Sequence, residues 1–202
     1  MPRELSASEV EDFREKICDI ALDIFAEKGV EGLTLREVAA RLGVSPMTPY
    51  RYFKDKEAIL AAVRTRAFND FAAALENAVN RGKDAVASSE AAGRAYANFA
   101  FMHAEAYRLM FTVAQKDAEA KDKGLQLAVE RARATMSYHV EQLVKEGVLE
   151  GDPELIGYVF WAALHGLVML ELSGKFSKRY DFNKVRRETF RALWQGFLRK
   201  QE

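Results

Sequence analysis

Proline is rare in this chain of 202 residues, and its distribution is the strongest constraint on the fold. The four prolines are Pro2, Pro46, Pro49 and Pro153. Because proline disrupts helix interiors, the long proline-free stretches between Pro49 and Pro153 and after Pro153 can form helices. Apolar residues recur at steps of three and four, and no strand-like alternation is found. The sequence therefore predicts an all-α fold.

The helices can be placed approximately from periodicity and end signals. Ser6 with Glu9 indicates a capping box at the start of the first helix, and Gly29 indicates its end. A joint after the first three helices predicts domains at 1–54 and 55–202. We expect about nine helices, at residues 7–28, 35–42, 46–52, 55–80, 85–103, 105–113, 118–146, 153–173 and 182–200.

Composition narrows the class of protein. Hydrophobic residues make up 49% of the chain, and its 30 basic residues are balanced by 30 acidic ones. The net charge therefore does not indicate nucleic acid, a membrane or an acidic substrate as a partner. The single cysteine, Cys18, rules out a disulfide framework and is expected to pack as a small buried residue. The histidines at 103, 139 and 165 lie on three different expected helices, without the spacing of metal ligands. We expect no metal site, no cofactor and no catalytic residues.

The chain also shows no sign of export or membrane insertion. Its N-terminus lacks the charged and then apolar pattern of a secretory signal. The longest uncharged run, residues 155–170, has 16 residues. This is short of the roughly 20 residues that span a bilayer. We therefore expect a buried helix there, no membrane partner and a cytoplasmic protein.

Two short helices in the N-terminal region carry the most specific pattern. Thr34 and Glu37 indicate a second capping box, and Gly43 can take the left-handed conformation that ends this helix. Ser45 and Pro46 suit the cap and first position of the next helix. Helices joined by so tight a turn cross steeply, which predicts a helix-turn-helix motif.

Local charge supports the same interpretation. Residues 33–66 hold seven basic and three acidic residues, a net charge of +4, whereas residues 1–32 carry a net charge of −5. Basic and aromatic residues alternate over 50–56, where we expect Phe53 in the core and Tyr50 and Tyr52 facing outward. Clustered cations of this kind contact the phosphates of nucleic acids.

The segments 33–39, 43–45 and 48–56 together resemble the N-terminal domain of the tetracycline-repressor (TetR) family of transcriptional regulators. The segment Trp161-Ala162-Ala163-Leu164-His165-Gly166 is similar to the Trp-His-Gly signature of one C-terminal subtype of that family. The resemblance implies a homodimeric repressor that binds double-stranded DNA through residues 1–54. It implies that residues 55–202 bind an effector and dimerise.

By position, the resemblance assigns the contacts with DNA. The residues assigned to base edges are Pro46, Met47 and Thr48, with Arg36 as a further candidate. Those assigned to phosphates are Thr34, Ser45, Tyr50, Tyr52 and Lys56. Arg51 and Lys54 complete the set of candidate DNA contacts. Pro49 departs from the family, which usually has an aliphatic residue there. Because Pro49 lacks an N–H group and crowds the Ser45 carbonyl, we expect a bent or tightened first turn, with Thr48 biased away from helical geometry.

The effector site is less clearly marked. Aromatic and methionine side chains recur at helical spacing, and such a stripe is either ordinary core or, as the resemblance implies, the wall of a pocket for a small apolar effector. The candidate pocket residues are Phe99, Met102, His103, Tyr107, Met110, Met136, His139, Trp161 and His165. The basic residues of 175–202 are interpreted as a solvated helix face.

The helices at 153–173 and 182–200 are the candidates for a dimer interface. The first is apolar on nearly all sides and needs cover from its own core and from a partner. Two such helices from each subunit would form a four-helix bundle. The two recognition elements would then read a pseudo-palindrome, with half-sites about 34–36 Å or more apart.

Two other classes of function stay open at this point. One is a helical protein-interaction or scaffolding module with a vestigial helix-turn-helix, which the unusual Pro49 favours. The other is an all-α enzyme that uses a pocket around His165, for which no paired nucleophile or acid–base couple is found.

Overall fold

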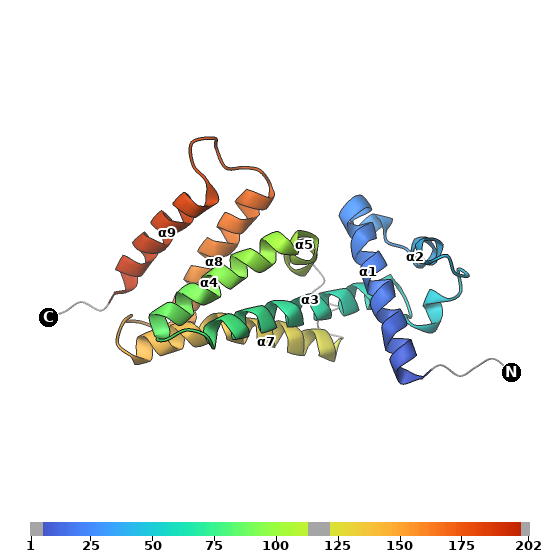
Figure 1. Ribbon diagram of the computed structural model, residues 1–202, viewed down its shortest axis with the longest axis horizontal. Coiled ribbons are helices and arrows are strands. Elements are labelled where there is room, and N and C mark those ends of the chain that lie inside the picture. Colours follow the sequence, from blue (N-terminus) through green and yellow to red (C-terminus); the bar gives the residue numbers. More distant parts are fainter. Residues whose placement is uncertain (1–5, 113–121, 199–202) are drawn as a thin grey trace. The chain divides into compact units, whose positions relative to one another are not determined.

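The computed structural model describes residues 6–112 and 122–198 and confirms the all-α fold within them (Figure 1). These ranges hold eight α-helices, one 3₁₀ helix and no strand. The elements are α1 (Ala7–Gly32), α2 (Leu35–Leu42), η1 (Pro49–Arg51), α3 (Lys56–Val79), α4 (Ala85–Met102), α5 (Ala104–Thr112), α7 (Lys123–Lys145), α8 (Pro153–Leu172) and α9 (Phe182–Phe197). Parts of the helices expected at 105–113, 118–146 and 182–200 lie outside the described residues.

The chain packs as two compact units. Unit 1 comprises the described residues within Met1–Ala67 and Glu105–Ala128, and unit 2 those within Phe68–Ala104 and Val129–Glu202. The helices α3 and α7 have residues in both units. The functional division expected between residues 54 and 55 stays a prediction.

The first helix begins where its sequence signals predict, but it continues past the predicted end at Gly29 as far as Gly32. The Ser6 N–H donates to the Glu9 carboxylate at 2.8 Å, and the Glu9 N–H donates to the Ser6 hydroxyl at 3.2 Å, which is the predicted capping box. Gly29, at φ 68° and ψ −172°, interrupts the helical backbone of α1. Only a residue without a Cβ takes this conformation at low cost.

Unit 1 has its own apolar core. One face of α1 packs against α2, the N-terminal half of α3 and Leu109 of α5. Cys18 lies in this core, 6% exposed, as expected. The other buried members are Ile17, Ala21, Ile24, Leu33, Leu35, Val38, Phe53, Ile59, Leu60 and Val63.

In unit 2, α8 and α9 form a helical hairpin (Figure 1). The Phe160 ring of α8 lies 5.7 Å from Phe190 and 6.3 Å from Trp194, both on α9. The Glu150 N–H donates to the Phe197 carbonyl at 2.9 Å, which joins the end of α9 to the segment before α8. Gly157 of α8 is buried against α7, where a Cβ would lie at an ordinary contact distance of 3.7 Å from the Met136 carbonyl oxygen.

The helix α8 is less buried in the single chain than we expected from the sequence. It has 20 residues, its most apolar 18-residue stretch has a mean hydropathy of 1.7, and 33% of that stretch is buried. Within the described ranges it is the one helix whose length and composition would allow it to cross a membrane. The 16-residue uncharged run underestimated this length because the helix also includes Glu154 and Glu171 near its ends. Part of the apolar surface of α8 is therefore exposed to solvent in the single chain, and its burial requires a partner.

Candidate nucleic-acid interface and ligand cavity

The turn after α2 has the backbone that the sequence predicts. The Thr34 hydroxyl accepts from the Glu37 N–H at 3.1 Å, and Gly43 is left-handed at φ 66° and ψ 30°. The buried Ala39 carbonyl accepts from the Val44 N–H at 3.0 Å, which closes the turn. The second capping box is only half formed, because the Glu37 carboxylate bonds to cations instead of returning to Thr34.

The segment after this turn is shorter than predicted. In place of a helix over 46–52, the chain makes a turn and then the 3₁₀ helix η1. The Ser45 carbonyl accepts from the Thr48 N–H at 2.8 Å, a bond between residues three apart. Pro49 occupies the position whose N–H would have made the α-helical bond to Ser45. The expected tightened turn is therefore confirmed, and the expected helix is wrong.

Two residues of this segment differ from expectation in detail. Thr48 keeps helical geometry, at φ −63° and ψ −48°, so the restriction imposed by the following proline does not displace it. Tyr52 is half-buried, with its ring 4.6 Å from the Phe13 ring, so it does not face outward as predicted. Phe53, 3% exposed, is in the core as predicted.

Ion pairs between α1 and α2 fix the first part of the motif. The Arg41 guanidinium bonds the Glu27 carboxylate with two nitrogens, at 2.9 and 2.5 Å, and the Glu37 carboxylate at 3.2 Å. Lys28 reaches the same Glu37 carboxylate at 2.8 Å. Hydrogen bonds from Lys28 and Arg41 lower the pKa of Glu37, and the bond from Arg41 lowers that of Glu27. Arg41 is thus occupied within the protein.

Arg14 of α1 holds the other end of the recognition segment. Its guanidinium donates to the Tyr52 carbonyl at 2.6 Å and lies 4.2 Å from the centroid of the Phe53 ring. A cation over an aromatic face is attracted to it. No signal in the sequence singled out Arg14, because its partners lie 38 residues further along the chain.

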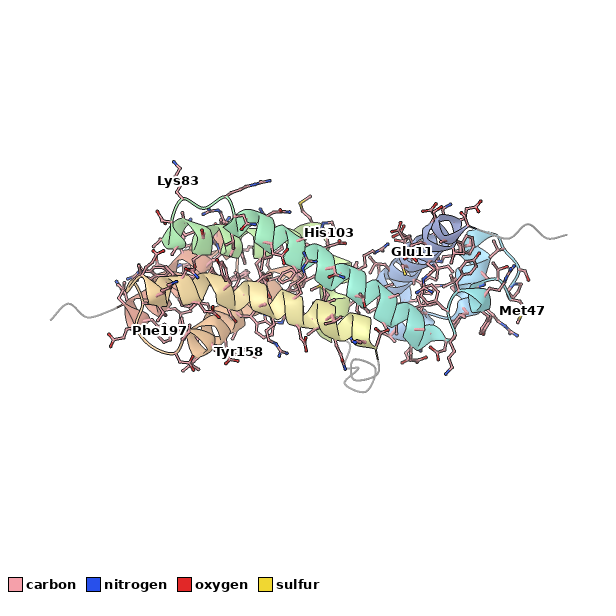
Figure 2. The ribbon with its side chains drawn as sticks, turned by 90° about the horizontal axis from the view of Figure 1, so that it is seen from below. Glu11, Met47, Lys83, His103, Tyr158 and Phe197 are labelled. Atoms are coloured by element: carbon pink, nitrogen blue, oxygen red, sulfur yellow. The ribbon has the colours of Figure 1, made fainter. Side chains whose placement is uncertain are left out.

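The other predicted DNA contacts are largely at the surface of unit 1. Met47 is 67% exposed and Tyr50 is 49% exposed, and Figure 2 shows Met47 at an outer edge of the unit. Thr34, Arg36, Ser45, Pro46, Arg51 and Lys54 are also exposed, while Thr48 and Lys56 are half-buried. Among the described residues no carboxylate forms an ion pair with Arg36, Arg51, Lys54 or Lys56, whereas Arg66 pairs with Asp19 at 2.7 Å. The cations around the turn are therefore available to phosphates.

Unit 2 contains a cavity of about 900 Å³. Its walls come from α4, α7, α8 and α9, with Leu75 of α3. Met136, His139 and Trp161 of the predicted pocket residues line it. The other six do not: Phe99 is buried beside Phe71, Met102 and His103 are exposed, Tyr107 and Met110 are buried in unit 1, and His165 lies one turn beyond Trp161.

A hydrogen-bonded chain crosses from α8 to α4 beside the cavity. The Trp161 indole N–H donates to the Tyr96 hydroxyl at 3.0 Å, and this hydroxyl lies 3.2 Å from Nδ1 of His165. Because an indole nitrogen can only donate, the Tyr96 proton is left for Nδ1. Burial lowers the pKa of His165, which favours the neutral ring that such an acceptor requires. Trp161 and His165 are thus both bonded to Tyr96 of a neighbouring helix, and their contact with a ligand stays a prediction.

His139 of α7 is different. It lines the cavity, and its buried Nδ1 has no hydrogen-bond partner among the described residues. Burial lowers its pKa to about 4, so the ring is neutral at physiological pH. In the part of the chain that the structure describes, no group of three or more His, Cys, Asp or Glu side chains is arranged to hold a metal ion.

The capped turn, the exposed recognition segment and the available cations around it define a helix-turn-helix DNA-binding protein. Two family models match the chain: "Bacterial regulatory proteins, tetR family" over residues 17–63, and "Tetracyclin repressor-like, C-terminal domain" over residues 89–196. The chain belongs to the TetR family of transcriptional regulators. The more particular Trp-His-Gly subtype stays a prediction.

Individual relatives agree with this assignment. The chain is 30% identical over 165 residues to the HTH-type transcriptional regulator Rv0681 of Mycobacterium tuberculosis, covering 80% of this chain and 71% of that protein. It is 42% identical over 50 residues to the class D tetracycline repressor of Escherichia coli, but the match spans only 23% of that protein. A solved structure of a protein of unknown function from Rhodococcus sp. RHA1 has a TM-score of 0.82 at 26% identity, covering 98% of this chain and all of that one.

Proposed function

We propose that this transcriptional regulator is a cytoplasmic repressor that a small molecule releases from its operator. Regulators of the family bind DNA operators, act as dimers and respond to small molecules. The observation that carries the proposal is that one chain has both a cation-bearing recognition turn in unit 1 and a 900 Å³ cavity in unit 2. The helix α3 has residues in both units and would couple them.

The dimer would form through the exposed face of α8, together with α9. Leu155, Tyr158 and Leu170 are 58%, 42% and 44% exposed, and Tyr158 is labelled in Figure 2. Ala162 and Gly166 lie between them on the same face and are also exposed. A Cβ added at Gly166 would meet no atom within 4 Å, so a second helix could pack closely there. A second copy of α8 offers the matching apolar face.

In this dimer, two recognition turns would read a pseudo-palindromic operator. Arg36, Met47 and Thr48 would contact base edges, while Arg51, Lys54 and Lys56 would hold phosphates. The effector would bind better to a conformation with a different spacing of the two turns. By linkage, DNA and effector then weaken each other's binding by the same factor.

The first test is a selection of genomic fragments with the purified protein, followed by affinity measurements at several salt concentrations. We expect one palindromic site, with log affinity falling linearly with log salt. Lys54→Ala should reduce the slope by about 2 per dimer, since each lost phosphate contact is worth about 0.9. Lys16→Ala removes an exposed cation of α1 and serves as the control. Weak binding to DNA that does not depend on salt concentration or on DNA sequence would instead support the interaction-module hypothesis.

The dimer needs a separate test. Ala162→Arg places a charge in the middle of the exposed α8 face and should convert the dimer to a monomer in sedimentation velocity. Asn98→Arg adds the same charge at an exposed position of α4 and should leave the dimer intact. If both variants sediment like the unaltered protein, α8 does not form the interface.

A further inference from the structure

The walls of the unit 2 cavity differ in chemistry from one side to the other. The sides formed by α7 and α8 are mainly apolar and aromatic, with Met136, Phe160, Trp161 and Leu164. Most of the charged lining residues come from α9, namely Arg186, Arg187, Glu188 and Arg191, alongside its aromatic Phe190 and Trp194, and α4 adds Glu90 and Arg94. A ligand that fits both sides has an apolar body and a polar end.

Ion pairs show which of the charged residues that line the cavity are already neutralised. Arg94 of α4 bonds the Glu90 carboxylate at 3.2 Å, and Arg191 of α9 bonds the Glu188 carboxylate at 2.8 Å. Both glutamates that line the cavity are therefore used. No carboxylate of the described residues forms an ion pair with Arg186 or Arg187. These two guanidinium groups give the α9 side of the cavity its net positive charge.

The burial of Arg186 makes its charge more effective. Arg186 is half-buried, whereas Arg187 is exposed. A half-buried cation is screened less by solvent than an exposed one. Guanidinium groups also bind carboxylates with two parallel hydrogen bonds, a geometry that a neutral hydroxyl cannot match.

Gly93 provides the space for the apolar body. It lies inside α4, where glycine is a poorer helix former than alanine. It lines the cavity, and a Cβ built there would meet no atom within 4 Å. No helix among the described residues approaches closely enough to require a glycine at this position, so its effect is to widen the cavity.

We propose that the cavity binds an amphipathic acid, with its apolar body between α4, α7 and α8 and its anionic group on Arg186 and Arg187. This inference rests on the proposed function and replaces the small apolar effector with an acid that has a large apolar part. His139, which also lines the cavity, is neutral and adds no charge to it.

Intrinsic fluorescence can test the proposal on the full-length protein. Both tryptophans of the chain, Trp161 and Trp194, line the cavity. The probes are 12-bromododecanoate and 12-bromododecan-1-ol, which share a chain with a quenching bromine and differ only in the head group. We expect the acid to bind about tenfold more tightly than the alcohol, as one charge-assisted contact would give.

Three variants separate the two ends of the ligand. The double variant Arg186→Gln/Arg187→Gln should bind both probes with equal, weak affinity. The double variant Arg179→Gln/Lys184→Gln removes two exposed cations that do not line the cavity and should keep the preference for the acid. Gly93→Leu, which also favours the helix, should block both probes.

Equal affinity for the two probes, no quenching by the acid, or a preference that survives loss of Arg186 and Arg187 would overturn the proposal. Operator affinity at saturating acid is measured separately. If the acid binds as expected but operator affinity does not change, the ligand assignment stands and the proposed release from DNA fails.

Discussion

The burial of His139 makes the stability of this protein depend on pH in a way that can be calculated. An accessible histidine has a pKa of about 6.5, and burial lowers that of His139 to about 4. Between these two values the unfolded chain binds a proton that the folded chain excludes. Stability is therefore fully present above pH 6.5 and is lost as the pH falls toward 4.

The size of the effect follows from the two pKa values. One pKa unit corresponds to about 1.4 kcal/mol. Lowering the pH from 7.5 to 5.0 therefore reduces the free energy of unfolding by about 2 kcal/mol, and lowering it below 4 reduces it by about 3 kcal/mol. His165 adds to this loss in the same direction, since burial lowers its pKa as well. The contribution of His139 alone requires a variant that lacks only this titrating group.

The assay is urea unfolding of the His139→Gln variant at pH 7.5 and pH 5.0, at a fixed protein concentration because dimerisation shifts apparent stability. The variant should lose about 2 kcal/mol less than the unaltered protein between the two pH values. His103→Gln removes an exposed histidine and should behave like the unaltered protein. If the His139 variant loses as much stability as its parent, the ring is not buried in the neutral form.

Three other substitutions test separate parts of the structure. Gly43→Ala places a Cβ on a left-handed residue and should cost about 1 kcal/mol in urea unfolding, and no loss would contradict the observed turn. Arg14→Met removes the contact with the Tyr52 carbonyl and should weaken operator binding about threefold to tenfold, as the loss of a hydrogen bond worth about 1 kcal/mol does, with an unchanged salt slope. A reduced slope would mean that Arg14 contacts phosphate itself. Tyr96→Phe removes the acceptor of the Trp161 N–H and should lower the free energy of unfolding by about 1 kcal/mol, and an unchanged value would mean that this hydrogen bond does not stabilise the fold.

Most of the fold could be predicted because its signals are local. Capping residues, a glycine after a helix and apolar spacing act within a few residues, so Ser6 and Gly43 marked their helix ends correctly, whereas Gly29 marked a break within α1 three residues before its end. The helix expected over 46–52 failed for a reason also present in the sequence. Pro49 removes the N–H that the first α-helical bond needs, and the chain takes the shorter 3₁₀ bond.

The residues around the cavity were harder to predict because they depend on how helices pack. Aromatic spacing indicated that part of the region from Phe99 to Met110 would face a ligand, but it could not show which helix faces look into the cavity. Arginines 186 and 187 of α9 were interpreted as part of a solvated face, and only the packing of α9 places them on a cavity wall. The Arg14 contact was likewise invisible, because it joins segments 38 residues apart.

The burial of Cys18 has a practical consequence for measuring this regulator. The only thiol of the chain is 6% exposed, and burial raises its pKa to about 11, so it stays protonated and unreactive at neutral pH. In a Met47→Cys variant, the new thiol at this exposed position would then be the one site that reacts with a spin label or a dye. The distance between the two labels of a dimer would report the separation of the recognition turns directly, with and without ligand.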